Sequence, residues 1–126
     1  HADAKIDDAL ATAGLSSREL VLMGFSQGAA MSAYTGLRRR CLGVMPMGGP
    51  CPPREQLLPD HQETRVCVIS GDCDRYAPHD HIREAFAKYA KVEPGDGVHI
   101  IEGLEHRVQS EHATIGLAFL RSCGCE

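Results

Sequence analysis

The chain has 126 residues, 43% of them hydrophobic and 24% charged, with a formal net charge of −4. This length and composition are typical of one globular domain. The weak negative charge gives no electrostatic basis for binding nucleic acid or an anionic membrane surface, and no apolar run is long enough to span a bilayer. The start shows no signal-peptide pattern, so we expect a cytoplasmic protein with reduced cysteines. Because the first residue is His1, we expect a processed, cloned or incomplete N-terminus.

Hydrophobic spacing predicts the order helix, strand, helix, strand, strand, helix, strand, helix. The expected ranges are 3–13, 19–24, 27–38, 42–45, 65–70, 79–91, 98–101 and 108–121. Pro46 after the strand at 42–45 implies that the ladder of this strand ends nearby, and the Gly- and Pro-rich stretch 48–59 is predicted to be a loop. Alternating strands and helices predict an α/β fold, with a mostly parallel sheet of about four strands and helices on both faces. Residues 1–126 form a single predicted domain.

The segment Gly24–Gly28, with the sequence Gly-Phe-Ser-Gln-Gly, lies between a predicted strand and a predicted helix. This placement is typical of the nucleophile elbow of α/β-hydrolases, where a strained turn exposes the serine at the carboxyl edge of the sheet. Side chains at either flanking glycine are expected to collide with neighbouring backbone. The alternative is an ordinary glycine-rich turn with a solvated serine. We interpret Ser26 as the candidate nucleophile.

A serine hydroxyl needs a base to take its proton, and the base needs an acid to orient it. Asp72 and Asp74 follow the strand at 65–70, and His106 follows the strand at 98–101, so all three are predicted at the carboxyl edge of the sheet with Ser26. Spacing does not separate the two aspartates, and either is able to cap the turn before the helix at 79. Of the seven histidines, His106 is the one placed like a general base.

The remaining histidines, cysteines and basic residues give weaker signals. We interpret His99, inside a strand, and His112, in mid-helix, as structural. The other histidines are His1, His61, His79 and His81, none with partners at metal-ligand spacing. The cysteine spacing does not match a usual zinc site. The basic run 38–40 is interpreted as cations at a helix C-terminus.

These motifs together resemble the phospholipase/carboxylesterase family of α/β-hydrolases, which includes the acyl-protein thioesterases. The elbow is similar to that of the family, residues 71–78 resemble its Gly-x-x-Asp-x-x-Val-Pro acid loop, and residues 103–106 resemble its Gly-x-x-His base loop. The resemblance implies that Asp74 is the acid and that the backbone N–H of Gln27 belongs to the oxyanion hole. It also implies that residues 47–50, including Gly49, line an acyl pocket and bind substrate.

The chain resembles the C-terminal half of that fold. The family's upstream strands and its His-Gly-x-Gly loop, which supplies a second oxyanion donor, have no counterpart before residue 19. The strand at 19–24 is therefore expected to have an open edge, through which the chain is able to form a homo-oligomer.

The main hypothesis is a serine hydrolase that cleaves carboxylic esters or acyl thioesters through Ser26, His106 and Asp74, without a metal or organic cofactor. The alternative is a catalytically impaired or inactive hydrolase fragment that acts as a partner-binding module. A nucleotide-binding domain is disfavoured because the glycine fingerprint and the lysine of such loops are missing from the sequence. The sequence leaves open whether the substrate is an ester or a thioester, and how long its acyl chain is.

Overall fold

The computed structural model describes residues 2–49, 64–86 and 97–125. Its elements, in chain order, are α1 (Ala2–Ala13), the 3-10 helix η1 (Ser17–Glu19), β1 (Val21–Phe25), α2 (Gln27–Arg39), β2 (Gly43–Met47), β3 (Arg65–Gly71), α3 (His79–Phe86), β4 (Gly97–Ile101) and α4 (Ser110–Ser122). The predicted order of helices and strands is confirmed. The predicted end of the helix at 79–91 and most of the predicted loop at 48–59 lie outside the described residues.

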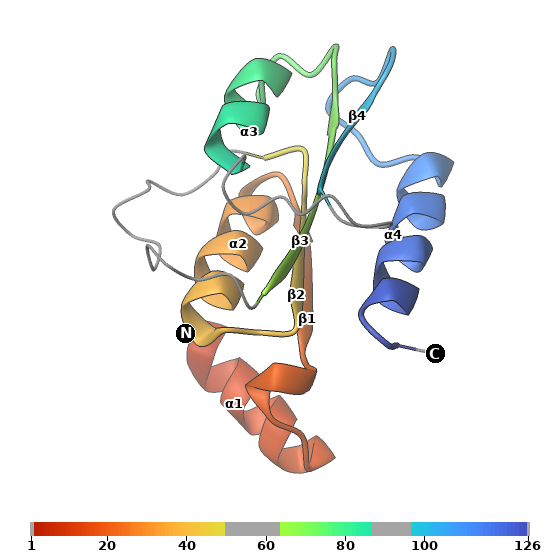
Figure 1. Ribbon diagram of the computed structural model, residues 1–126. Helices are drawn as coiled ribbons and strands as arrows, with labels where there is room; N and C mark the ends of the chain where they lie inside the picture. The colour runs from red at the N-terminus through yellow and green to blue at the C-terminus, as the bar shows by residue number, and fades with distance from the viewer. Residues whose placement is uncertain (1, 50–63, 87–96, 126) are drawn as a thin grey trace.

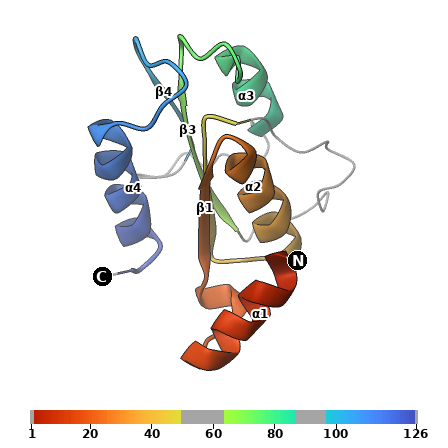
Figure 2. The same cartoon turned by 180° about the vertical axis from the view of Figure 1, so that it is seen from behind.

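The strands form one parallel sheet in the order β1-β2-β3-β4. Helices α2 and α3 cover one face of this sheet, and α4 covers the other (Figure 1, and from behind in Figure 2). The predicted α/β architecture with helices on both faces is therefore confirmed. In parallel sheets all strands end at the same edge, so the loops that follow β1, β3 and β4 meet there. None of the helices within the described ranges is long and apolar enough to cross a membrane.

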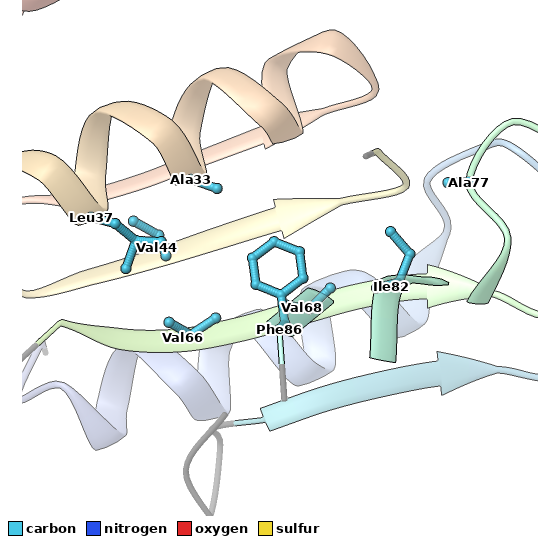
Figure 3. Packing of buried hydrophobic residues seen from close by; sticks show 8 residues of the cluster. All are labelled: Ala33, Leu37, Val44, Val66, Val68, Ala77, Ile82 and Phe86. Atoms are coloured by element: carbon cyan, nitrogen blue, oxygen red, sulfur yellow. The ribbon is translucent and has the colours of Figure 1, made fainter. Parts of the chain in front are cut away.

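The core has two parts, one on each face of the sheet. Figure 3 shows the larger part, in which side chains of α2 and α3 pack on β2 and β3; its members are Ala33, Leu37, Val44, Val66, Val68, Ala77, Ile82 and Phe86. The smaller part, under α4, contains Met45, Cys67, Ile69 and Phe119. Alternate residues of β3 enter opposite parts, as the twofold side-chain period of a strand requires. β3 is consequently apolar on both faces, as predicted.

The ladder of β2 ends close to Pro46, as predicted. β2 continues to Met47, and Pro46 pairs with Gly24 in the unbroken register between β1 and β2. The register between β2 and β3 omits Met45 and Pro46 and resumes where Met47 pairs with Ile69. Proline lacks an N–H, so it removes one ladder bond to a single neighbour, and the pairing on its other side holds the strand.

β1 forms one edge of the four described strands. An apolar groove of about 220 Å³ lies beside it and is lined by Ala2, Ile6, Leu22, Met23, Gly28, Met31, Ser32 and Thr35. Met23 and Met31 are about half exposed, at 50% and 53%. Nearby, Arg39 in the last turn of α2 donates to Asp3 at 2.8 Å and to Asp7 at 2.5 Å, which fastens α1 to α2. Cations at the end of α2 were predicted, but this ion-pair clamp was not.

Candidate active site

Ser26 occupies a strained turn at the carboxyl end of β1. Its backbone has φ 59° and ψ −117°, a combination that a non-glycine residue rarely adopts, and it forms the N-cap of α2. Such strain costs on the order of 1–3 kcal/mol and persists where the surroundings fix it. Here the Ser26 N–H donates to the carbonyl of Met47 at 3.0 Å, and the Ser26 carbonyl accepts from the N–H of Ala29 at 3.0 Å. The turn has the geometry expected of a nucleophile elbow.

The two glycines that flank the turn differ in their surroundings. A Cβ on Gly24 would overlap the backbone carbonyl of Gly28, as predicted. The corresponding prediction for Gly28 is wrong, because a Cβ there would meet nothing within 4 Å. Gly28 lies on the apolar groove beside β1 and faces open space.

A chain of hydrogen bonds joins the three side chains predicted for catalysis. His106 Nε2 lies 3.0 Å from Ser26 Oγ, and His106 Nδ1 lies 2.8 Å from Asp74 Oδ2. With the proton on Nδ1 donated to the carboxylate, Nε2 is free to accept the serine proton. The three residues come from the loops after β1, β3 and β4 and are separated by up to 80 positions in sequence.

Asp74 is held in place by the turn that it caps. The residue is 5% exposed, and its Oδ1 accepts from the N–H of Tyr76 at 2.9 Å and from the N–H of Ala77 at 3.1 Å. From the sequence, turn capping and contact with His106 are alternative roles for an aspartate in this loop. Asp74 fills both, because each of its carboxylate oxygens serves a different set of donors.

Asp72 is directed elsewhere. Its Oδ1 accepts from the N–H of Gly103 at 2.7 Å, which ties the loop after β3 to the loop after β4. A second tie runs from the N–H of Cys73 to the carbonyl of Leu104 at 3.0 Å. Gly71 permits this close approach, because a Cβ there would overlap the Leu104 backbone. Asp72 therefore helps to fix the loop that carries His106 without touching the imidazole.

Two aromatic rings flank His106, and sequence reasoning assigned neither. The Phe25 ring centroid lies 4.7 Å from that of His106, and the Tyr76 centroid lies 5.0 Å away. Their positions, one inside the elbow and one two residues after Asp74, are the only signal in the sequence. Contacts of this kind restrict the rotation of an imidazole that has to face both Ser26 and Asp74.

The loop after β2 also reaches the site. A Cβ on Gly49 would overlap the Ser26 carbonyl, so Gly49 packs directly on the elbow. Gly48, which was not singled out from sequence, has φ +57°, and a Cβ there would lie 2.9 Å from Phe25 Cε2 and 3.4 Å from Asp74 Oδ2. Both positions favour glycine because no side chain fits between these groups.

The N-terminus of α2 begins directly after the serine, at Gln27. The first N–H groups of a helix have no intrahelical partner and carry the positive end of its dipole. The Gln27 N–H therefore belongs to the part of the site where negative charge is best tolerated. This position is the one predicted for an oxyanion donor.

The remaining described histidines lie away from Ser26. His99 is in β4, and His79 and His81 are in the first turn of α3. His112 lies in the first turn of α4, not in mid-helix as predicted, and its Nδ1 accepts from the N–H of Gln109 at 3.1 Å. Burial is the main cause that lowers the pKa of His112. His1 and His61 fall outside the described residues. Within the described ranges, no three His, Cys, Asp or Glu residues gather as metal ligands would.

A cavity of about 320 Å³ opens beside the imidazole. It is lined by Cys73, Arg75, Tyr76, Glu105, His106 and Arg107. The pKa of the Cys73 thiol is raised, chiefly by its hydrogen bond to Asp72, so Cys73 is not an activated thiolate. The polar groups that remain on the cavity wall are two guanidinium groups, one carboxylate and one phenol.

Comparisons with known proteins agree with this geometry. A family profile described as Phospholipase/Carboxylesterase matches residues 3–123. Among solved structures, esterase PE8 superposes with a TM-score of 0.80 at 30% identity, covering 96% of this chain and 58% of that one. SOBER1 of Arabidopsis thaliana superposes with a TM-score of 0.77 at 17% identity, covering 95% of this chain and 60% of that one. This second likeness shows a shared fold.

A Mycobacterium tuberculosis puromycin-hydrolyzing peptidase is also similar in fold, with a TM-score of 0.63 at 15% identity, covering 94% of this chain and 24% of that one. The search of curated proteins found no match. The chain thus spans about three fifths of the length of esterase PE8 and of SOBER1.

Proposed function

Because this chain belongs to the phospholipase/carboxylesterase family, we propose that it is a serine hydrolase that cleaves carboxylic esters or acyl thioesters. Ser26 is the nucleophile, His106 the general base and acid, and Asp74 the residue that orients His106. The observation that carries the proposal is the hydrogen-bond chain from Ser26 Oγ through the imidazole to the Asp74 carboxylate, at 3.0 Å and 2.8 Å. The strained backbone of Ser26 supports it independently, since strain of this kind concentrates at functional sites.

Acylation proceeds in two steps on these residues. Ser26 Oγ attacks the carbonyl carbon of the substrate while His106 Nε2 takes the serine proton, which forms a tetrahedral oxyanion. The bond from carbon to the leaving oxygen or sulfur then breaks, and the imidazolium returns its proton to that atom. The Asp74 carboxylate stabilises the imidazolium and keeps the Nδ1 proton directed toward itself.

Deacylation repeats the sequence with water. His106 removes a proton from water, the hydroxide attacks the acyl-enzyme, and Ser26 leaves with the proton that the imidazole gives back. The Gln27 N–H donates to the oxyanion in both halves of the reaction, and one such donor is typically worth about 10²–10³ in kcat. Gly49, which packs on the elbow, belongs to the segment that lines the acyl pocket and binds substrate. No step uses a metal or an organic cofactor.

The proposal is tested by labelling with a fluorophosphonate probe, read by intact mass. We expect one adduct on the chain, none on Ser26→Ala, and an undiminished adduct on Ser110→Ala, a matched control at an exposed serine that begins α4. Hydrolysis of p-nitrophenyl esters and of acyl thioesters of increasing length then separates the two substrate classes. A folded chain that forms no adduct would refute the proposed function.

A second candidate function is association with another copy of the chain through β1. It is favoured by the edge position of β1 and by the apolar groove beside it, where Met23 and Met31 are half exposed. Edge strands with apolar neighbours are prone to pair with further strands. We expect the molar mass of the wild-type chain, measured by light scattering, to rise with protein concentration. The molar mass of Met23→Lys is expected to stay at the value of the monomer. A wild-type chain that is monomeric at all concentrations would exclude this function.

A further inference from the structure

We propose that the cavity beside His106 binds an anionic group, a carboxylate or a phosphate, on the alcohol or thiol portion of the substrate. The inference rests on the proposed function, and it specifies which esters or thioesters the site prefers. The observations that carry it are the position of the cavity, the charges on its wall, and the way its two walls are fixed to each other.

The position of the cavity assigns it to the leaving group. In acyl transfer the group that protonates the leaving atom has to lie within hydrogen-bond reach of it, so the leaving portion departs on the side of the imidazole. His106 lines the cavity, whereas Ser26 does not. A group bound there therefore belongs to the portion released in the first half of the reaction, not to the acyl portion retained on Ser26.

The charges on the wall favour an anion. Arg75 and Arg107 both line the cavity and are both exposed to solvent. Within the part of the chain that the structure describes, no ion pair engages either guanidinium. Guanidinium groups bind carboxylate and phosphate through paired N–H donors. Glu105 is the one carboxylate on the wall, so the lining side chains carry more positive than negative charge.

The Asp74 carboxylate does not lie on the cavity wall. Its side chain is 1% exposed, and its two oxygens are occupied by His106 and by the N–H groups of Tyr76 and Ala77. Asp72 is engaged by the N–H of Gly103. Neither carboxylate lines the cavity. An incoming anion therefore meets the two guanidinium groups on the open side of the site.

The two walls are fixed relative to each other before a ligand arrives. Arg75 and Tyr76 belong to the loop after β3, and Arg107 belongs to the loop after β4. Hydrogen bonds join these loops from Gly103 N–H to Asp72 at 2.7 Å and from Cys73 N–H to Leu104 at 3.0 Å. Tyr76, which is 70% exposed, offers a ring face for the apolar part of the leaving group. Such preorganisation lowers the entropic cost of binding.

The kinetic test compares para-acetoxybenzoate with its uncharged methyl ester, which carry the charge difference on the leaving group. The measured quantity is the ratio of kcat/KM for the anionic over the neutral substrate. In the double variant Arg75→Gln/Arg107→Gln we expect this ratio to fall by about 3- to 10-fold, the scale of solvent-exposed charge pairs. Intrinsic reactivity of the two esters cancels when the variant is compared with the wild type.

Two further variants test the direction of the charge effect and provide a control. Glu105→Gln removes the opposing charge, so the same ratio is expected to rise by about 2-fold. Arg83→Gln removes an exposed arginine of α3 that does not line the cavity, and the ratio is expected to stay unchanged. A ratio that is unaffected in the double variant, or that falls equally in Arg83→Gln, would overturn the proposal. An equal fall for a succinate monoester, whose charge lies on the acyl side, would overturn it too.

A binding measurement distinguishes failure of this inference from failure of the proposed function. Isothermal titration of the wild-type chain with para-hydroxybenzoate and with phenyl phosphate reads the site without any catalysis. Binding that weakens by about 3-fold or more in the double variant supports the anion site, even in a chain that forms no serine adduct. The tighter ligand distinguishes a carboxylate from a phosphate. A wild-type chain that binds neither anion would refute the site while leaving the serine chemistry intact.

Discussion

Replacing Asp74 by asparagine separates the two roles of this residue. The asparagine keeps an oxygen at the Oδ1 position, where it accepts from the N–H groups of Tyr76 and Ala77 at 2.9 Å and 3.1 Å. Its amide nitrogen then faces His106 Nδ1, where the carboxylate oxygen lies 2.8 Å away in the wild type. An N–H donor at that point favours the tautomer with the proton on Nε2, which is unable to accept from Ser26. In a triad this exchange lowers kcat by about 10⁴-fold.

Alanine at the same position removes both roles. The Ala77 N–H is buried, and an unsatisfied buried donor costs on the order of 1–3 kcal/mol. The Tyr76 N–H is part-buried and adds a smaller amount. We therefore expect Asp74→Ala to lower the free energy of unfolding by about 2–4 kcal/mol and Asp74→Asn to change it by less than about 1 kcal/mol. Both variants should lose the serine chemistry.

The assay pairs the rate of fluorophosphonate labelling with urea denaturation of the same preparations. Asp72→Asn is the matched control, because it keeps an acceptor for the Gly103 N–H and does not touch His106. It is expected to label at close to the wild-type rate. Asp74→Asn that labels as fast as the wild type would refute the assignment of the acid. An asparagine variant as unstable as the alanine variant would refute the argument from the turn.

Four further predictions rest on the packing and the charges. Gly24→Ala is expected to lower the free energy of unfolding by about 1–3 kcal/mol, because the added Cβ meets the fixed backbone of Gly28. Gly28→Ala should raise it by about 0.4–1 kcal/mol, since its Cβ meets nothing within 4 Å; urea denaturation checks both. Arg39→Gln should lower it by about 1 kcal/mol at low salt and less at high salt, because two ion pairs from α1 are lost. Burial lowers the pKa of His112 in the folded chain from 6.5, so below that pH the unfolded chain binds more protons and the free energy of unfolding falls as the pH drops. In urea denaturation at a series of pH values, this decrease should be smaller in His112→Gln than in the wild type. The control His81→Gln should show the same decrease as the wild type.

Each of these has an outcome that contradicts it. A Gly24→Ala chain as stable as the wild type, or a Gly28→Ala chain less stable than the wild type, would mean that the elbow packs differently from the structure. A salt-independent effect of Arg39→Gln would mean that packing of its alkyl chain, not its charge, fastens α1. A pH profile of His112→Gln that matches the wild type would place the proton uptake on another group.

The elements and the site could be predicted from sequence for different reasons. The strands at β1 and β3 are marked by apolar runs, and the hydrolase motifs lie directly after strands, so topology alone brought Ser26, Asp74 and His106 to one edge. The spacing in the sequence did not separate Asp72 from Asp74, because the choice depends on which of the two carboxylates faces the imidazole. That orientation follows from hydrogen bonds to Gly103 and to residues 76–77, which only the folded loops create.

The errors have a common physical origin. Gly28 was assigned a steric role by its place in the motif, although the space beside it is open. His112 was placed by an estimated helix boundary, and the true start at Ser110 makes it a capping residue. In each case tertiary surroundings decided the outcome, and a local pattern does not contain them.

The contacts between the proposed catalytic groups are all made within this chain, and hydrogen bonds fix each group in place. Ser26 is held by Met47, His106 by Asp74, and the loop that carries His106 by Asp72 through Gly103. β2, which carries Met47, and β3, which leads to both aspartates, are the two inner strands of the described sheet. A substitution at the exposed edge of β1 therefore leaves the hydrogen bond from the Ser26 N–H to the Met47 carbonyl on the β2 side intact. For this reason the reactivity of Ser26 and association at the β1 edge are expected to be separable: Met23→Lys should alter the second and spare the first.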